Sequence, residues 1–105
     1  MDQAARAWAA REAPKHPELR RLGYFGSCAR GDWGVGSDLD LIAIVTDSPR
    51  DWMHRSLDWS LDGLPVPADL VIYTEAEWEQ MRAEARRFAR TVEAEAVWLF
   101  PGAGP

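Results

Sequence analysis

The stretch from Leu39 to Val45 constrains the fold more than any other part of this chain. It reads Leu-Asp-Leu-Ile-Ala-Ile-Val, an apolar and β-branched run that is followed by Asp47-Ser48-Pro49. A run of this kind, closed by turn-forming residues, predicts a buried β-strand. Because side chains alternate along a strand, Asp38 and Asp40 should share one face, while Leu39 and Leu41 turn the other way into apolar packing.

Helical and extended patterns alternate along the whole chain. We predict the other strands at 19–25, 68–73 and 97–100, and helices at 2–12, from Ser27, at 51–61 and from Thr74 onward. The helix at 51–61 depends on the spacing of Met53, Leu57, Leu61 and Leu64. The last helix depends on the capping box Thr74/Glu77 and on the repeat Trp78, Met81, Ala85, Phe88, Val92. The alternation favours an α/β (α+β) fold with one mixed sheet of about four strands flanked by helices.

Length, charge and cysteine content exclude several classes of protein. A length of 105 residues predicts a single domain over 1–105. Seventeen acidic and 12 basic residues give a net charge of −5, which argues against a nucleic-acid polymer as partner but not against a nucleotide held through a metal. One cysteine, Cys28, excludes an internal disulfide. No stretch resembles a membrane span or a signal peptide, so we expect a cytoplasmic protein without membrane contact.

Three aspartates could form a metal site. Asp38 and Asp40 lie side by side on the predicted strand, and Asp69 begins the next one. If the two strands are neighbours, the three carboxylates converge at one end of the sheet. Paired carboxylates repel each other unless a cation lies between them, and Mg²⁺ prefers carboxylates together with substrate phosphates. Three acids in this arrangement can hold two divalent ions.

A Gly-Ser turn precedes the acidic pair and suits a phosphate group. Gly26 allows close approach of the backbone, and a helix that begins at Ser27 would present free N–H groups to an anion. Arg30 follows one turn later and could donate to the same anion. Each of these motifs alone is common, since an Asp-x-Asp at a strand end is usually just a turn or a pair of solvent-exposed residues. Their combination and order are much rarer.

The compound pattern resembles the minimal nucleotidyltransferases of the DNA polymerase β superfamily. The resemblance rests on Gly26-Ser27-Cys28-Ala29-Arg30-Gly31, Ser37-Asp38-Leu39-Asp40-Leu41 and Ala68-Asp69-Leu70-Val71-Ile72-Tyr73, and it covers about 19–100. It implies that Gly26, Ser27 and Arg30 bind the nucleotide, with the role of Arg30 less defined. It also implies that Asp38, Asp40 and Asp69 are catalytic and hold Mg²⁺, with Asp69 helping to activate the acceptor hydroxyl.

The resemblance further implies an activity and a partner. We expect an adenylyltransferase-like enzyme that transfers a nucleoside monophosphate, AMP from ATP first among them, to a hydroxyl acceptor. The chain is too short to carry an acceptor domain, so we expect a second protein, and minimal nucleotidyltransferases often pair with a small helical HEPN toxin as its antitoxin. Two alternatives stay open: a partner-binding module without turnover, and a subunit of an oligomeric transferase that modifies a small molecule.

Several other residues have two interpretations. His16 and His54 are expected at the surface or in caps. Arg82, Arg86 and Arg90 either complement the helix dipole or form a basic stripe toward a partner or phosphate. Trp78 is expected in the core, whereas Trp33 either shields the nucleotide or anchors its loop. Trp52 and Trp59 widen the apolar face of the helix at 51–61, as extra core or as a protein-binding patch.

Overall fold

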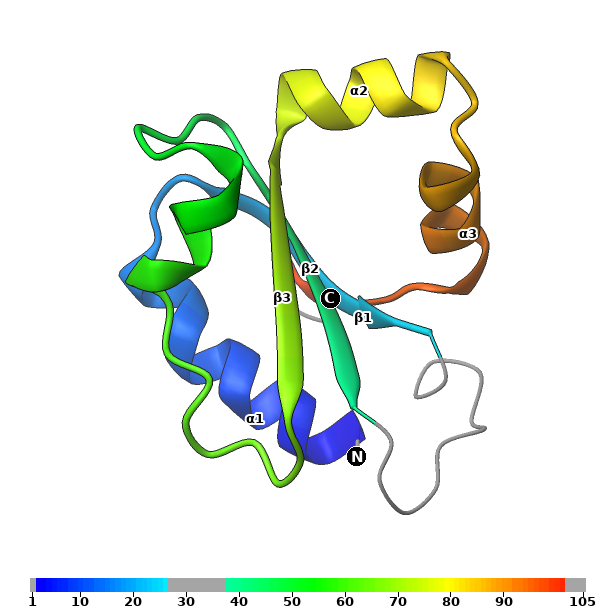
Figure 1. Cartoon of the computed structure of the whole chain (residues 1–105). Coiled ribbons are helices and arrows are strands. Elements are labelled where there is room, and N and C mark those ends of the chain that lie inside the picture. The colour runs from blue at the N-terminus through cyan, green and yellow to red at the C-terminus, as the bar shows by residue number, and fades with distance from the viewer. Residues whose placement is uncertain (1, 27–37, 102–105) are drawn as a thin grey trace.

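The chain folds around one four-stranded mixed sheet in the computed structural model, which describes residues 2–26 and 38–101 (Figure 1). The strand order is β3-β2-β1-β4. Strand β1 pairs antiparallel with β2 and with β4, and β2 pairs parallel with β3. The elements in chain order are α1 (Asp2–Glu12), the 3₁₀ helix η1 (Ala13–Lys15), β1 (Leu19–Phe25), β2 (Leu39–Val45), the 3₁₀ helix η2 (Trp52–Asp58), β3 (Ala68–Thr74), α2 (Glu75–Ala83), α3 (Arg87–Glu95) and β4 (Val97–Phe100).

Each face of the sheet has its own apolar core. Helix α1 covers one face, where Trp8 packs with Leu39 and Leu41, and α2 and α3 lie against the other, where Trp78 and Val92 pack (Figure 1). The predicted α/β (α+β) fold class is therefore confirmed, as are the strand β2 and the placement of Trp78 in the core. Within the described residues, no helix is both long and apolar enough to span a membrane.

The helix predicted from Thr74 onward is wrong in its length, because it is divided into α2 and α3. Its capping box is present as predicted: Thr74 Oγ1 accepts from the Glu77 N–H at 3.2 Å, and Glu77 Oε1 accepts from the Thr74 N–H at 2.9 Å. The division occurs at Ala85, whose φ of 53° is left-handed. The Arg86 N–H bonds to the Met81 carbonyl and the Ala85 N–H to the Arg82 carbonyl, both at 3.0 Å, which is the Schellman pattern of a helix end.

The helix predicted at 51–61 is also wrong, because this segment forms the shorter 3₁₀ helix η2. With three residues per turn, a spacing of four no longer keeps side chains on one face. Met53 and Leu57 are accordingly exposed, whereas Leu61 and Leu64 lie beyond the helix and pack against the core beside α1. The segment is held by Arg55, which donates to the carbonyl oxygens of Arg50 and Ile72, both at 3.2 Å.

Of the two positions expected for His16, the surface or a cap, the structure shows the cap. His16 is the C-cap residue of η1 and is buried, with its Nε2 2.8 Å from Glu12 Oε2 and its ring stacked on Trp59 at 3.7 Å between centroids. Trp59 thus belongs to the packing around α1, while Trp52 is about half exposed. The pair that was expected to widen one apolar face is separated, since only Trp59 joins the core.

Candidate active site

The site predicted from the sequence lies where β1 ends and where β2 and β3 begin. Asp40 is directly opposite Asp69 in the parallel pairing of β2 with β3, and opposite Phe25 in the antiparallel pairing of β2 with β1. Paired residues on adjacent strands are about 5 Å apart. The two strands are neighbours, which is the condition for the carboxylates to converge, and their register brings two of the three to the same level of the sheet.

The alternation of side chains decides which face of the sheet carries these acids. Leu39 and Leu41 are buried in the core beside α1, whereas Ile42 belongs to the core beneath α2 and α3. Asp40 is two residues before Ile42, so its carboxylate points to the α2/α3 side. Asp69 is two residues before Val71, which packs in that same core. Both carboxylates therefore lie on the sheet face that α2 and α3 cover, in line with the apolar side chains of Ile42 and Val71.

Gly26 is placed against Asp40. Its φ of +78° is in the left-handed region, and a Cβ at this position would be 2.6 Å from Asp40 Oδ2. A side chain is disfavoured there on two grounds, because this conformation is strained for residues other than glycine and because the Asp40 carboxylate would have to move. The turn after β1 therefore lies close enough to the Asp40 carboxylate that a side chain at Gly26 would displace it.

The three carboxylates differ in their exposure. Asp38, which lies just before β2, is exposed, Asp40 is partly buried, and Asp69 is exposed at the second position of β3. Ser27 and Arg30, the other residues predicted to bind the nucleotide, lie outside the described residues, as do Cys28 and Trp33. Gly26 is thus the member of the predicted Gly-Ser turn whose geometry is described.

The donor set of the site fits a hard cation. Across 2–26 and 38–101, no three His, Cys, Asp or Glu side chains are grouped closely enough to form a metal cage. A cage of three protein ligands is not required for Mg²⁺, which usually keeps several waters and binds one or two carboxylates together with substrate phosphates. The juxtaposed Asp40 and Asp69, both oxygen donors, meet that requirement.

One feature of this face is not evident from the sequence motifs. Tyr73 lies four residues after Asp69 on β3 and lines a cavity of about 260 Å³ together with Trp52, Met81 and Arg86. Burial and the nearby Glu77 carboxylate raise the pKa of the Tyr73 hydroxyl above its ordinary value of 10.0. The sequence did contain a signal that could have identified Tyr73. It lies an even number of residues after Asp69, which predicts that its side chain is on the same face as the acids.

The arginine stripe is not formed as one row. Arg82 is on α2 and Arg90 is on α3, so the break at Ala85 removes the four-residue alignment. Arg82 pairs with Glu79 at 2.8 Å and with Glu93 at 3.0 Å, and Arg86 pairs with Glu84 at 2.7 Å. Arg82 and Arg86, two of the three residues of the predicted stripe, are therefore engaged in ion pairs within the chain.

The fold and the acidic pair define a small α+β domain with carboxylates at one end of two adjacent strands of a mixed sheet. Residues 10–99 match the sequence profile of the nucleotidyltransferase domain. The chain therefore belongs to the nucleotidyltransferase domain family.

Solved structures share this fold. One is a candidate nucleotidyltransferase from Sulfolobus solfataricus, with a TM-score of 0.62 and 21% identity over 91% of this chain and 76% of that one. Another is a toxin–antitoxin complex with AMP-PNP, with a TM-score of 0.62 and 17% identity over 96% of this chain and 73% of that one. No curated protein sequence matches this chain significantly.

Proposed function

We propose that this chain is a Mg²⁺-dependent nucleotidyltransferase that transfers AMP from ATP to a hydroxyl group of a partner protein. The observation that carries the proposal is the juxtaposition of Asp40 and Asp69 on adjacent parallel strands beside Gly26, in a chain of the nucleotidyltransferase domain family. The acidic surface is compatible with this function because a metal ion, rather than lysine, would neutralise the phosphates.

The residues of the site have separate tasks in this proposal. Asp38, Asp40 and Asp69 would hold Mg²⁺, which when bound neutralises phosphate charge and lowers the pKa of a coordinated hydroxyl. Gly26 would let the backbone approach the β- and γ-phosphates, with Ser27 and Arg30 as further donors. Asp69 would take the proton of the acceptor hydroxyl. The acceptor oxygen then bonds to the α-phosphorus, and the bond from that phosphorus to the pyrophosphate oxygen breaks.

The proposed acceptor is a HEPN-type toxin, for which this chain acts as antitoxin in the cytoplasm. The toxin–antitoxin complex described above has the fold of this chain and contains AMP-PNP, an adenine nucleotide analogue. That likeness supports both the adenine nucleotide and a protein partner as the first choices to test. The proposal predicts that the partner gains one or more adenylyl groups when ATP, Mg²⁺ and this chain are supplied.

Nucleotide binding measured by calorimetry tests the site. Wild type should bind a non-hydrolysable ATP analogue with Mg²⁺ and much more weakly with EDTA. Asp40→Asn keeps the side-chain shape but removes the charge, so the Mg²⁺-dependent part of binding should be lost and transfer should fall by at least about a hundredfold. Asp47→Asn is the matched control, because Asp47 is an exposed aspartate beyond the other end of β2. Equal binding by wild type and Asp40→Asn would contradict the proposal.

A second candidate function is neutralisation of the partner by binding alone. The observation that favours it is the exposure of Trp52, Met53 and Leu57 on η2, away from the acids. The double variant Asp38→Asn/Asp40→Asn separates the two functions. If this variant still neutralises the toxin in cells while the partner carries no added adenylyl mass, binding is sufficient and turnover is not required.

A further inference from the structure

The strand that carries Asp69 lies at an edge of the sheet. The strand order β3-β2-β1-β4 gives β3 a single neighbouring strand, β2, on which Asp40 lies. An edge strand presents a row of backbone N–H and C=O groups to which a further strand can bond. The opposite edge strand, β4, is separated from β3 by two strands, so the edge that adjoins the acids is that of β3. Figure 1 views the sheet from this edge, with β3 in front.

The register shows which backbone groups of β3 point away from β2. The Pro67 carbonyl accepts from the Leu39 N–H of β2 at 2.9 Å. Because successive residues of a strand direct their backbone groups to alternate sides, the odd-numbered residues of 67–73 face β2 and the even-numbered ones face outward. The outward-facing residues are Ala68, Leu70, Ile72 and Thr74.

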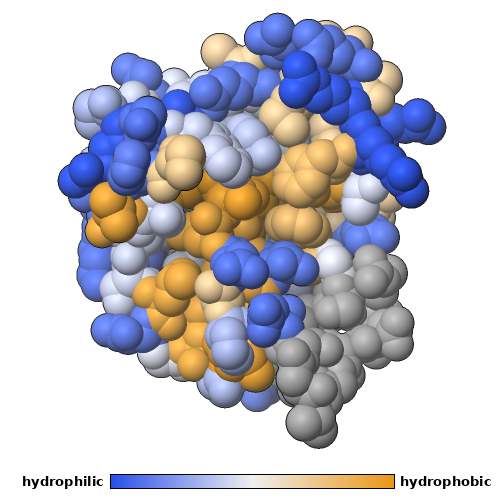
Figure 2. Space-filling view, viewed as in Figure 1, coloured by the Kyte–Doolittle hydropathy of each residue, from blue (hydrophilic) through white to orange (hydrophobic). Residues whose placement is uncertain are grey.

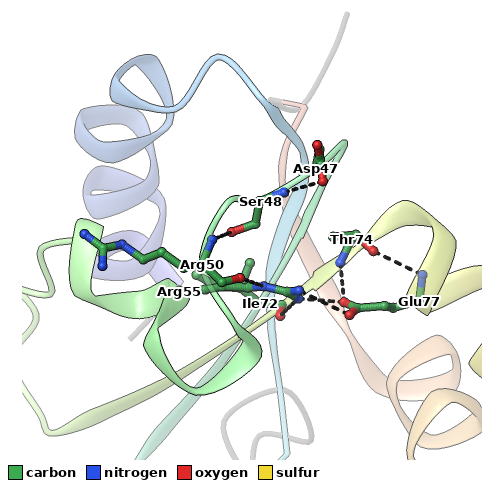
Figure 3. A network of polar contacts seen from close by, with 7 residues as sticks. All are labelled: Asp47, Ser48, Arg50, Arg55, Ile72, Thr74 and Glu77. Carbon is green, nitrogen blue, oxygen red and sulfur yellow. Dashed lines mark hydrogen bonds and ion pairs between the residues drawn. The ribbon is translucent and has the colours of Figure 1, made fainter.

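The end of this edge that is distant from the acids is occupied within the chain (Figure 3). The Arg55 guanidinium donates to the Ile72 carbonyl at 3.2 Å, and the Thr74 N–H donates to Glu77 Oε1 at 2.9 Å. Arg55 also pairs with Glu77 at 2.6 Å, so a single ion pair covers both outward positions. Covering an edge in this way prevents it from pairing with another strand.

The end beside the acids is open. Within the described part of the chain, no group hydrogen-bonds to the outward N–H and C=O of Ala68 or of Leu70. Both residues are partly exposed, and Asp69 between them is exposed. Leu70 and Val66 are only partly buried against the core beside α1, and Figure 2 shows apolar surface in the middle of this side of the molecule. Residues 68–70, termed the open edge of β3, therefore offer the backbone and apolar contacts that bind an extended peptide segment.

The register also determines what an added strand presents to the site. Asp40 and Asp69 form a row across β2 and β3 on the face that α2 and α3 cover. A residue opposite Asp69 on an added strand continues this row, with its side chain on the same face and its Cβ about 5 Å from that of Asp69. A serine, threonine or tyrosine at this position would lie beside the carboxylate that is proposed to take the acceptor proton.

A second copy of this chain is a poor occupant of the open edge. Asp69 is the central residue of 68–70, so two such edges paired antiparallel would place Asp69 opposite Asp69. Like charges directly opposite each other destabilise a strand pair. The open edge of a second copy also contains only Ala68, Asp69 and Leu70, none of which carries an acceptor hydroxyl. A different protein, with a hydroxyl residue in an extended segment, meets both requirements.

We propose that the open edge of β3 binds an extended segment of the partner protein and places its acceptor residue opposite Asp69. This inference rests on the proposed function, which supplies the reaction. The acceptor oxygen bonds to the α-phosphorus of ATP, its proton passes to the Asp69 carboxylate, and the broken P–O bond leaves its electron pair on pyrophosphate. Pairing of the main chains fixes the position of the hydroxyl, so the acceptor is selected by its extended conformation and its register.

A proline substitution tests the backbone contact by calorimetry with the HEPN-type protein encoded beside this chain. Leu70→Pro removes the outward N–H but leaves the bonds of β3 to β2, as proline does on an edge strand. Its Kd for the partner should be at least about tenfold higher than that of Leu70→Ala, the matched control, which shortens the side chain and keeps the N–H. The two variants should bind the ATP analogue and Mg²⁺ equally. Circular dichroism melting verifies folding, and Ala68→Pro, compared with wild type, replaces Leu70→Pro if that variant does not fold.

Hydrogen exchange measured by NMR tests the same contact in the wild-type chain. Binding of the partner should slow exchange of the outward Leu70 N–H at least about tenfold, because this group then bonds to the added strand. The Asp69 and Val71 N–H groups are internal controls, since they face β2 and should exchange slowly with and without the partner. A partner that docks elsewhere, or through a helix, leaves the exchange of Leu70 unchanged.

The outcomes distinguish this inference from the proposed function. Equal Kd values for the proline variant and its control, or unchanged exchange at Leu70, overturn the inference. A wild-type dimer in sedimentation that Leu70→Pro dissociates also overturns it, because the occupant is then a second copy. If the partner does not bind wild type, both the inference and the proposed acceptor fail. If the partner protects Leu70 but ATP adds no mass to it, docking at the open edge stands and the transferase proposal fails. If the partner is modified without protecting Leu70, the proposed function stands and the inference fails.

Discussion

Gly26 brings the turn after β1 close to the Asp40 carboxylate. Two independent observations favour glycine at this position. Its φ of +78° is left-handed, and a Cβ at this position would be only 2.6 Å from Asp40 Oδ2. The first concerns the conformation of the turn and the second concerns the position of a side chain proposed to hold a metal. A substitution at Gly26 should therefore affect both stability and chemistry, and the two effects can be separated.

Gly26→Ala should lower the free energy of unfolding by about 1–2 kcal/mol, the usual cost of a left-handed non-glycine residue. It should also reduce nucleotide transfer at least tenfold, because the methyl group forces the Asp40 carboxylate to move. Gly63→Ala is the matched control: its φ is +91°, but its Cβ would meet only the flexible end of Arg11. Urea unfolding and a transfer assay measure both effects. Equal activity of the two variants would show that the close approach at Gly26 has no role in catalysis.

The sequence predicted part of the site because alternation along a strand is a local property. Asp40 and the buried Leu39 and Leu41 follow directly from a period of two residues. The approach of Asp69 to Asp40 depends on which strands pair, and no local pattern encodes that choice. The cavity at Tyr73 was missed for a related reason, since it is lined by residues from η2, β3 and α2 that meet only in the folded chain.

At the scale of the elements, the two errors of prediction occurred where apolar spacing was taken for a continuous α-helix. The repeat through Trp78, Phe88 and Val92 is real, and all three side chains enter one core. The chain nevertheless turns at Ala85 between α2 and α3, without the glycine that normally marks such an end. In η2, the buried Arg55 and its carbonyl partners determine the local structure, and these contacts are distant in sequence.

The Schellman turn at Ala85 predicts a substitution that raises the stability of the protein, whereas most substitutions lower it. Ala85→Gly should stabilise the protein by about 1 kcal/mol, because glycine adopts the left-handed conformation without a Cβ penalty. Ala83→Gly, two residues earlier and within α2, should instead destabilise it by about 1 kcal/mol. Thermal and urea unfolding of the two variants test the pair. A loss of stability in Ala85→Gly would mean that the turn is not strained by alanine.

At the scale of the whole molecule, a buried polar contact joins the N-terminal helix to the segment after η2. Glu12 and His16 are both buried, the Ser60 N–H donates to Glu12 Oε2 at 3.2 Å, and the Trp8 indole N–H donates to the Ser60 carbonyl at 2.7 Å. Burial opposes ionisation of Glu12. The hydrogen bonds from His16 and Ser60, with Lys15 nearby, outweigh it and lower the pKa of Glu12 below its ordinary 4.5.

This contact predicts how stability depends on pH. A carboxyl group with a lowered pKa in the folded state contributes stability above its unfolded value, and the contribution disappears as the pH falls through the folded value. Glu12→Gln should therefore cost about 1.5–3 kcal/mol at pH 7, the range for hydrogen bonds to a charged group, and much less at pH 3. Glu79→Gln, which breaks only an exposed pair with Arg82, should cost under about 0.5 kcal/mol at both values. Urea unfolding at pH 7, 5, 4 and 3 measures these differences. If the free energies of unfolding of wild type and Glu12→Gln differ by the same amount at every pH in this range, ionised Glu12 does not stabilise the junction between α1 and the segment after η2.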